Sequence, residues 1–256
     1  MTERTAERTA ERTDGVLFIH AFPMDASMWS RQVDDLGKLW PVVVPDLPGF
    51  GGSPDAGSVM TMGAAADRCV EALDAAGVDR PVVCGLSMGG YVALELWRSA
   101  RTRVAGLVLA NTRAGADTEE AAANRRALAT RLRAEGSAFL VAEPPPLLGK
   151  GAPAELWQLV RDTIAAQPAA AIAAAAEGMA DRPDSTTDLG TIGVPTLVLT
   201  SEGDTLITPD VSLSMADQIE GADSVTLGDA GHLSNLEAPE AFSDALRAFL
   251  ARFRRD

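Results

Sequence analysis

Short runs of consecutive apolar residues alternate along the chain with longer segments in which apolar residues recur every three or four positions. An unbroken apolar run of strand length indicates a strand buried on both faces, and the longer spacing indicates a helix with one buried face. Strands and helices in this alternation predict an α/β fold, with a doubly wound, mostly parallel sheet of about six strands. The predicted strands are Val16–Ile19, Val42–Val44, Val82–Cys84, Val104–Leu109, Thr196–Leu199 and, more weakly, Val225–Leu227.

Five segments with helical spacing lie between or after these strands. From this alternation we assign residues 15–112 and 191–256 to one core built around the sheet. Such helices cover the two faces of a parallel sheet. The predicted helices are Met28–Leu36, Ala64–Ala76, Met88–Ser99, Val211–Ile219 and Pro239–Phe253.

Residues 113–190 interrupt the alternation, because they contain helical patterns but no strand pattern. Pro144–Pro146 cannot continue a helix, since proline lacks a backbone donor and restricts the residue before it. We therefore expect at least two helical pieces, forming a cap over the carboxyl edge of the sheet. The alternative is a second domain, for which the segment is short. The helical patterns lie at Thr118–Glu135, Ala154–Ala166 and around Ala169–Met179.

The N-terminal residues 1–14 repeat Thr-Ala-Glu-Arg and offer no apolar face, so we predict a disordered tail there. They contain no apolar segment of the kind found in secretory signals. The longest apolar runs, such as Val104–Ala110 and Ala169–Ala176, are shorter than the roughly 20 residues of a membrane-spanning helix. A cytoplasmic protein without a membrane partner is therefore expected.

Charge and cysteine content exclude several other classes. The formal net charge is −14, which disfavours nucleic acid as a partner because phosphate binding requires clustered Lys and Arg. The two cysteines, Cys69 and Cys84, have no metal-ligand spacing, and Cys84 lies in an apolar run where a buried thiol is expected. We predict no metal and no cofactor.

The first candidate for chemistry is Ser87, in the sequence Gly85-Leu86-Ser87-Met88-Gly89. This G-x-S-x-G motif follows a predicted strand and opens a predicted helix, which is the context in which such a serine is a nucleophile. The turn is so sharp that its neighbours must be small, hence the glycines around it. The alternative is a glycine-rich turn that contains serine by chance.

A serine nucleophile requires a base within hydrogen-bond reach. The chain has only two histidines. His20 ends the first strand and belongs to another motif, whereas His232 follows the last strand, where a loop can return over Ser87. We therefore predict that His232 is the general base.

The base requires a carboxylate that orients it. Asp204 follows the strand Thr196–Leu199 and gives the chain order Ser…Asp…His expected with this motif. Glu202 and Asp229 remain alternatives. Asp46 precedes the serine and fits a structural role in its own turn, and Asn111 is uncharged and therefore a weak rival.

An oxyanion formed at the substrate carbonyl requires fixed donors. The residue after the nucleophile, Met88, supplies one backbone N–H. The loop after the first strand supplies the second, and we assign it to Phe22 because Pro23 has no N–H.

Taken together, these motifs resemble the α/β-hydrolase superfamily in order and spacing over residues 16–255. Within it, Met24-Asp25, Met28-Trp29 and Leu109–Arg113 resemble the 3-oxoadipate enol-lactonases and related small carboxylesterases. Two features depart from the family pattern: Ala21 replaces the usual glycine of the oxyanion turn, and the usual N-terminal hairpin has no counterpart. The matching elements are His20–Pro23, Asp46–Ser53, Gly85–Gly90, Gly203-Asp204 and Gly231-His232.

The resemblance implies a serine-dependent hydrolase of a small carboxylic ester or lactone, acting through an acyl-enzyme on Ser87 as a monomer or homodimer. Dehalogenases and epoxide hydrolases of this superfamily use aspartate at that position, so Ser87 disfavours both. A cofactor-free perhydrolase, a C–C hydrolase, a thioesterase and a non-catalytic binder remain alternatives. Arginines near the cap could pair with a substrate carboxylate or could form a solvated helix face; they are Arg113, Arg125 and Arg126.

Overall fold

A six-stranded sheet forms the centre of the computed structural model, which describes residues 11–255. The strand order is β3-β2-β4-β5-β6-β7, and each neighbouring pair is parallel. The predicted doubly wound α/β sheet is therefore confirmed. The strands are β2 (Val16–Ile19), β3 (Val42–Val43), β4 (Val82–Leu86), β5 (Gly106–Ala110), β6 (Thr196–Ser201) and β7 (Asp223–Leu227).

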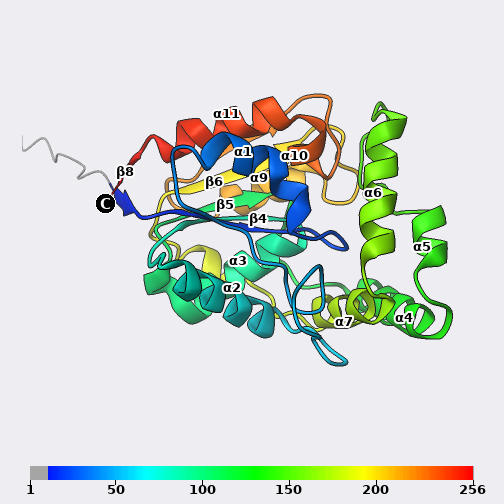
Figure 1. Cartoon of the computed structure of the whole chain (residues 1–256). Coiled ribbons are helices and arrows are strands. Elements are labelled where there is room, and N and C mark those ends of the chain that lie inside the picture. The colour runs from blue at the N-terminus through cyan, green and yellow to red at the C-terminus, as the bar shows by residue number, and fades with distance from the viewer. Residues whose placement is uncertain (1–10, 256) are drawn as a thin grey trace, which may run out of the picture.

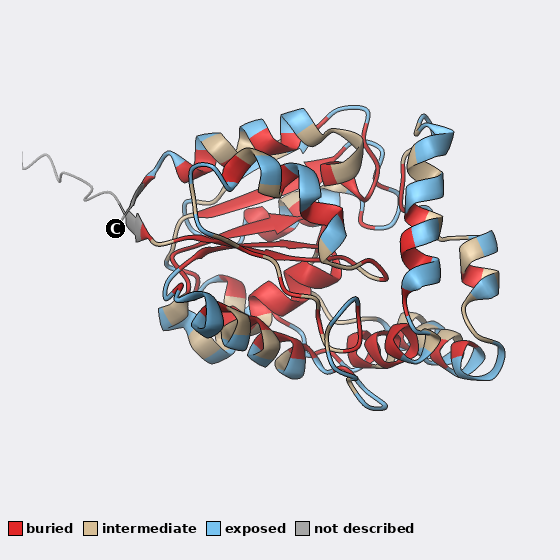
Figure 2. Ribbon diagram, in the orientation of Figure 1, coloured by how far each residue is buried: buried red, intermediate tan, exposed pale blue. Residues whose placement is uncertain are grey.

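Helices cover both faces of this sheet (Figure 1). The helices α1 (Ser30–Leu36) and α11 (Pro239–Leu250) lie on one face, and α2 (Met62–Ala76) and α3 (Met88–Ala100) lie on the other. Every residue of β2, β4, β5 and β6 is buried, and Figure 2 shows these central strands in the colour of buried residues. Burial on both faces explains the unbroken apolar runs of these strands. Short helices complete the core: η1 (Ala26–Trp29), η2 (Arg101–Arg103), α9 (Pro209–Ala216) and α10 (Ser234–Glu237).

Both ends of the described chain differ from the sequence-based prediction. We expected a disordered tail through residue 14, but Glu11–Thr13 form strand β1, and residues 1–10 lie outside the described residues. Likewise, the last helix ends at Leu250 rather than Phe253, because Phe253–Arg255 form strand β8. The strands β1 and β8 pair in parallel, so backbone hydrogen bonds between distant parts of the chain stabilise this segment, together with the burial of Phe253 in the core.

The region predicted as a cap, residues 113–190, contains helices and no strand in the structure. Pro144–Pro146 lie between α5 and α6, where no helix forms, as the loss of backbone donors requires. Figure 1 shows α4 to α7 grouped beyond one end of the sheet. The helices are α4 (Glu119–Glu135), α5 (Ala138–Ala142), α6 (Ala154–Ala166), α7 (Ala169–Ala180) and α8 (Thr186–Leu189).

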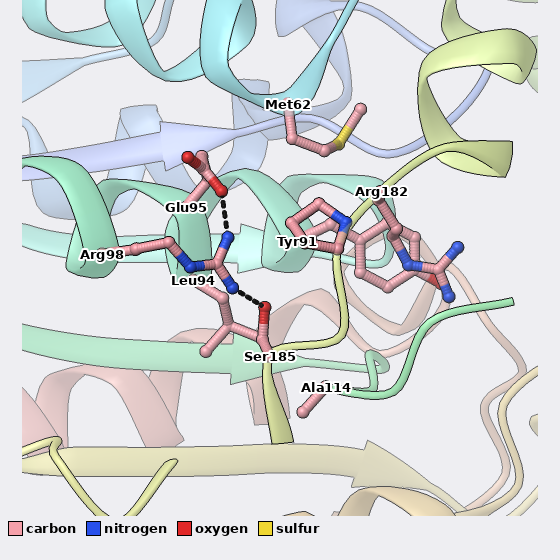
Figure 3. Close-up of a pocket in the computed structure, with 9 residues that line it drawn as sticks. Met62, Tyr91, Leu94, Glu95, Arg98, Ala114, Arg182 and Ser185 are labelled. Carbon is pink, nitrogen blue, oxygen red and sulfur yellow. Dashed lines mark hydrogen bonds and ion pairs between the residues drawn. The ribbon is translucent and has the colours of Figure 1, made fainter. Parts of the chain in front are cut away.

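The cap is joined to the core by apolar and polar contacts. One cluster of buried apolar residues runs from the sheet into α4 and α7. Arg98 on α3 donates to Ser185 Oγ at 2.9 Å (Figure 3) and to Asp188 Oδ2 at 2.6 Å. The continuous apolar cluster favours a cap over a second independent domain, although the boundaries at residues 113 and 190 stay a prediction. Among residues 11–255, no helix is both long and apolar enough to cross a membrane.

Candidate active site

Ser87 occupies the sharp turn between β4 and α3. Its backbone has φ 56° and ψ −114°, a conformation that is strained for any residue other than glycine. Two hydrogen bonds to β5 and the residues after it stabilise the turn. Ser87 N donates to Ala110 O at 2.9 Å, and Thr112 Oγ1 donates to Ser87 O at 2.8 Å. The turn is therefore fixed before any substrate arrives.

Glycines near Ser87 allow backbone segments to approach closely. A Cβ atom on Gly85 would lie 2.1 Å from Gly89 O, and one on Gly89 would lie 2.1 Å from Ile19 O. No side chain fits at either position. These contacts bring the start of α3 against the end of β2, which places Ser87 beside the loop that carries Phe22.

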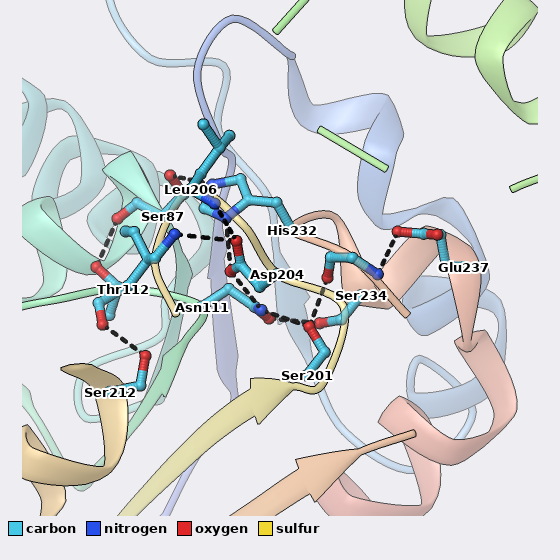
Figure 4. A network of polar contacts seen from close by, with 12 residues as sticks. Ser87, Asn111, Thr112, Ser201, Asp204, Leu206, Ser212, His232, Ser234 and Glu237 are labelled. Atoms are coloured by element: carbon cyan, nitrogen blue, oxygen red, sulfur yellow. Dashed lines mark hydrogen bonds and ion pairs between the residues drawn. The ribbon is translucent and has the colours of Figure 1, made fainter. Parts of the chain in front are cut away.

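A continuous chain of hydrogen bonds joins Ser87, His232 and Asp204 (Figure 4). The Ser87 Oγ lies 2.7 Å from His232 Nε2, and His232 Nδ1 lies 2.8 Å from Asp204 Oδ2. With Nδ1–H donating to the carboxylate, Nε2 is free to accept the serine proton. His232 and Asp204 are 2% and 3% exposed, and Ser87 is 9% exposed. The structure thus brings together all three side chains predicted from the sequence.

Asp204 receives four hydrogen bonds. Its Oδ1 accepts from the backbone N–H groups of Leu206 and Ile207, at 2.9 and 3.0 Å. Its Oδ2 accepts from His232 and from Asn111 Nδ2, the latter at 2.9 Å. Burial alone would raise the pKa of Asp204, but these donors, His232 foremost, hold it below its ordinary value. The carboxylate is therefore ionised.

Asn111 plays a part that the sequence did not indicate. It follows β5 with a positive φ of 44° and is fully buried. Its amide donates to Ser201 Oγ at 2.8 Å as well as to Asp204, and its oxygen accepts from Ser234 Oγ at 2.6 Å. Asn111 thus fixes the Asp204 carboxylate instead of replacing it. A polar residue at the end of a buried strand was the only signal in the sequence.

Glu237, on α10, is the second residue that sequence reasoning missed. Its two oxygens accept from Gly231 N at 2.7 Å and from Gly149 N at 2.8 Å. One carboxylate therefore ties the loop that carries His232 to the cap, close to a further bond from Leu233 N to Leu147 O at 2.8 Å. Burial raises the pKa of Glu237, although both N–H donors oppose that rise.

The other acidic candidates lie elsewhere. Glu202 and Asp229 are exposed and face a different, open cavity that does not contain Ser87. Asp46 accepts from Ala26 N and Gly52 N, both at 2.9 Å, so it stabilises its own turn as expected. Within residues 11–255, the hydrogen-bond partner of His232 among these acids is Asp204.

Phe22 and Met88, the predicted oxyanion donors, both belong to segments close to Ser87. Met88 is the first residue of α3, and a backbone N–H at that position has no acceptor within the helix. Phe22 follows β2, precedes a cis peptide bond to Pro23 and lines the same cavity as Ser87. That both N–H groups stabilise an oxyanion stays a prediction.

His20 fixes the loop that carries Phe22. Its ring is fully buried, with Nδ1 donating to Ala21 O at 3.0 Å and Nε2 accepting from Leu47 N at 3.0 Å. This pattern requires a neutral imidazole. Burial lowers the pKa of His20 accordingly. The two histidines therefore have separate positions: one supports the Phe22 loop and the other contacts Ser87.

A cavity of about 230 Å³ opens at Ser87 and His232. The sheet-based core supplies one side of it, and the cap supplies the other. Its volume is below the ~300–1,000 Å³ of most ligand pockets, which favours small ligands. The remaining residues around it are Phe22, Tyr91, Arg113, Arg125, Leu128, Pro145, Leu147, Met179, Leu206 and Ile207.

Metal and thiol chemistry have no candidate groups in this part of the chain. Among residues 11–255, no three His, Cys, Asp or Glu side chains are grouped so that they could hold a metal ion. Cys69 and Cys84 are buried free thiols. Burial raises the pKa of Cys69 to about 12 and that of Cys84 further still, so neither is a ready nucleophile.

Comparison with known proteins shows similarity in sequence and in fold. Residues 16–245 match the model of the alpha/beta hydrolase family. The chain is 30% identical to 3-oxoadipate enol-lactonase 1 of Acinetobacter baylyi, over 94% of this chain and 90% of that protein. A malate-bound esterase from Thermogutta terrifontis superposes with a TM-score of 0.90 at 40% identity, covering 94% and 92% of the two chains. The enol-lactonase from Burkholderia xenovorans gives 0.83 at 28%, covering 96% and 94%.

Proposed function

The chain belongs to the α/β-hydrolase family, and we propose that it hydrolyses small carboxylic esters or lactones through an acyl-enzyme on Ser87. The observation that carries this proposal is the hydrogen-bond chain from Ser87 through His232 to Asp204. The Ser87 end of this chain lines a cavity that is large enough for a small substrate. A serine hydroxyl becomes a useful nucleophile only beside such a base, oriented in turn by a carboxylate.

In the first half of the reaction, Ser87 Oγ attacks the carbonyl carbon while His232 Nε2 takes the hydroxyl proton. The ionised Asp204 stabilises the imidazolium that forms and keeps Nδ1 protonated. Collapse of the tetrahedral intermediate breaks the bond to the leaving oxygen, which takes the proton from Nε2. An ester then releases its alcohol, whereas a lactone retains it on the acyl group.

In the second half, water repeats the same steps. His232 Nε2 takes a proton from water as the oxygen attacks the acyl carbon, and it returns that proton to Ser87 Oγ. The acid is released and the serine is restored. No cofactor is required at any step, because all transferred protons pass through His232.

The oxyanion formed in both halves is stabilised by the backbone N–H groups of Met88 and Phe22 in this proposal. Donors fixed by the fold do not have to reorganise as the negative charge appears, and each is worth roughly 10²–10³ in kcat. The partial positive charge at the start of α3 adds to this stabilisation. The rigid turn at Ser87 and the His20 hydrogen bonds support such a fixed arrangement.

The relatives support the ester and lactone class. The similar proteins include an enol-lactonase and an esterase, which supports the proposal that this chain is an esterase or a lactonase. The same groups could serve a perhydrolase, a C–C hydrolase or a non-catalytic binder, but no contact in the cavity favours one of these. The cytoplasmic location and the monomeric or homodimeric state expected from the sequence stay predictions.

A direct test is hydrolysis of 4-nitrophenyl acetate and butanoate with and without a serine-reactive phosphonate. We expect turnover that the phosphonate abolishes in a 1:1 ratio to protein. A folded protein that neither hydrolyses these esters nor reacts with the phosphonate would contradict the proposal and favour the binder. Turnover that survives stoichiometric phosphonate would also contradict it.

A further inference from the structure

The cavity at Ser87 has a positively charged wall. Arg113, which follows β5 closely, and Arg125, on α4, both line it. Among the described residues that line this cavity, none is Asp or Glu. A local excess of positive charge stands out in a chain whose net charge is −14, because the surface as a whole repels anions.

The nearest carboxylate, Asp117, cannot neutralise this charge alone. Its side chain is fully buried and contacts three guanidinium groups: Arg113 at 2.5 Å, Arg125 at 2.5 Å and Arg182 at 2.8 Å. Burial alone would raise the pKa of Asp117, but the arginines, Arg125 foremost, hold it below its ordinary value. One negative charge thus faces three positive charges. Asp184, which also interacts electrostatically with Arg182, is exposed and accepts hydrogen bonds from backbone N–H groups.

The third arginine of this cluster serves as a support. Arg182 donates to Met179 O at 2.9 Å and to Gly115 O at 2.8 Å, and its guanidinium stacks on the Tyr91 ring at 4.1 Å (Figure 3). It is 6% exposed and does not line the Ser87 cavity. Arg182 therefore holds the Asp117 carboxylate in place from outside the cavity. Asp117 in turn orients the two arginines that do line the cavity.

Both cavity arginines retain unused donors. The Arg113 Nε atom is buried and has no hydrogen-bond partner among the described residues. Arg125 uses Nε on Asp117, and its Nη1 contacts only the weak thioether acceptor of Met179, at 3.5 Å. A buried guanidinium donor without an acceptor is costly, and the group that best satisfies such forks is a carboxylate.

We propose that Arg113 and Arg125 bind a carboxylate of the substrate, so that the preferred esters or lactones are small and carry a free carboxylate apart from the bond that is cleaved. This inference rests on the proposed function, because it places the carboxylate in the cavity that contains Ser87. It assigns the cap a role in specificity through charge, in addition to any role through size.

Matched ester pairs test the proposal. The first pair, mono-4-nitrophenyl glutarate and 4-nitrophenyl pentanoate, differs in a carboxylate on the acyl side. The second, 4-carboxyphenyl acetate and 4-methylphenyl acetate, differs in a carboxylate on the alcohol side. The readout is the ratio of kcat/KM for the charged ester to that for the neutral ester, after subtraction of the uncatalysed rate. We expect at least one of the two ratios to be tenfold or more lower in both R113Q and R125Q than in the wild type.

The matched control is R126Q, because Arg126 lies beside Arg125 on α4 but is exposed and paired with Asp181. We expect R126Q to leave both ratios within twofold of the wild type. R113K, which keeps the charge but not the fork, should give an intermediate ratio. Circular dichroism identifies any variant that fails to fold, and R113K then provides the comparison with the wild type.

Calorimetric binding of glutarate separates failure of this proposal from failure of the proposed function. If the protein hydrolyses no ester but binds glutarate tenfold more tightly than R113Q or R113K does, the carboxylate site stands and the hydrolase proposal falls. If neutral esters are hydrolysed while both ratios and glutarate binding are unchanged in R113Q, R125Q and R113K, the carboxylate site is overturned.

Discussion

Asn111 donates its side-chain amide to Asp204 Oδ2, the same oxygen that accepts the Nδ1–H of His232. The carboxylate is thus fixed from two directions before it can orient the imidazole. Because the Asn111 oxygen also accepts from Ser234 Oγ, the amide itself cannot rotate freely.

Replacing Asn111 by glycine tests this arrangement, since glycine tolerates the positive φ while removing the amide. A hydrogen bond to a charged group is worth about 1.5–3 kcal/mol. If part of that stabilisation is specific to the transition state, kcat should fall about tenfold, which corresponds to about 1.4 kcal/mol. Steady-state kinetics on a neutral ester measure it. Unchanged kcat in N111G, with a loss of thermal stability alone, would assign Asn111 a purely structural role.

His20 should make stability depend on pH. Burial lowers its pKa in the folded state, whereas the unfolded chain binds the proton near the ordinary value of about 6.5. The unfolded state therefore binds more protons as pH falls below about 6.5, and the free energy of unfolding decreases until the lowered folded-state pKa is reached.

Urea unfolding of the wild type and H20Q at pH 7.5 and 5.5 checks this expectation. H20Q should be less stable at pH 7.5, because the ring bonds to Ala21 and Leu47 are lost, and the gap should narrow at pH 5.5. Other titrating groups are common to both proteins and cancel. A gap of constant size would show that His20 does not resist protonation in the folded state.

Glu237 should couple the cap to the loop that carries His232. In E237Q one carboxylate oxygen becomes an amide nitrogen, which cannot accept from a backbone N–H. We expect faster hydrogen exchange at the Gly149 or Gly231 amide and a lower kcat. The matched control is E240Q, because Glu240 is an exposed residue of α11. If exchange at both glycines were the same in E237Q as in the wild type, the coupling would be absent.

Cap side chains in the cavity should limit the length of the acyl chain. Leu147 is buried and lines the cavity, so L147A creates space next to Ser87. Its backbone bond to Leu233 survives the change. We expect the optimum on a series of 4-nitrophenyl esters to move toward longer chains, whereas L159A, at an exposed residue of α6, should retain the wild-type profile. Identical profiles for L147A and L159A would show that Leu147 does not restrict the substrate.

Local patterns were sufficient to predict most of the sheet and the three side chains at its edge. Every residue of β2, β4, β5 and β6 is buried, so each of these strands contains a run of apolar residues that is visible in the sequence. The Ser87 motif and the scarcity of histidine then left few choices. Ser87, His232 and Asp204 follow three different strands of one parallel sheet, so their convergence follows from topology.

Features that depend on contacts between distant segments could not be predicted in this way. Strand β1 was missed because its partner, β8, lies at the other end of the chain and supplies backbone bonds that no apolar pattern records. Glu237 resembles an ordinary helical acid in the sequence, and only the approach of Gly149 reveals its role. The cluster around Asp117 likewise becomes apparent only when Arg113, Arg125 and Arg182 are placed in space.

The central claim is that Ser87 Oγ is the nucleophile, and covalent labelling combined with turnover tests it most directly. After reaction with a fluorophosphonate, intact-mass and peptide mass spectrometry should place one adduct on Ser87. S87A should take up no label, retain its fold and lose on the order of 10⁶-fold in kcat. The control S99A, at an exposed serine of α3, should match the wild type in labelling and turnover. An adduct on another residue, or near wild-type turnover by folded S87A, would contradict the mechanism.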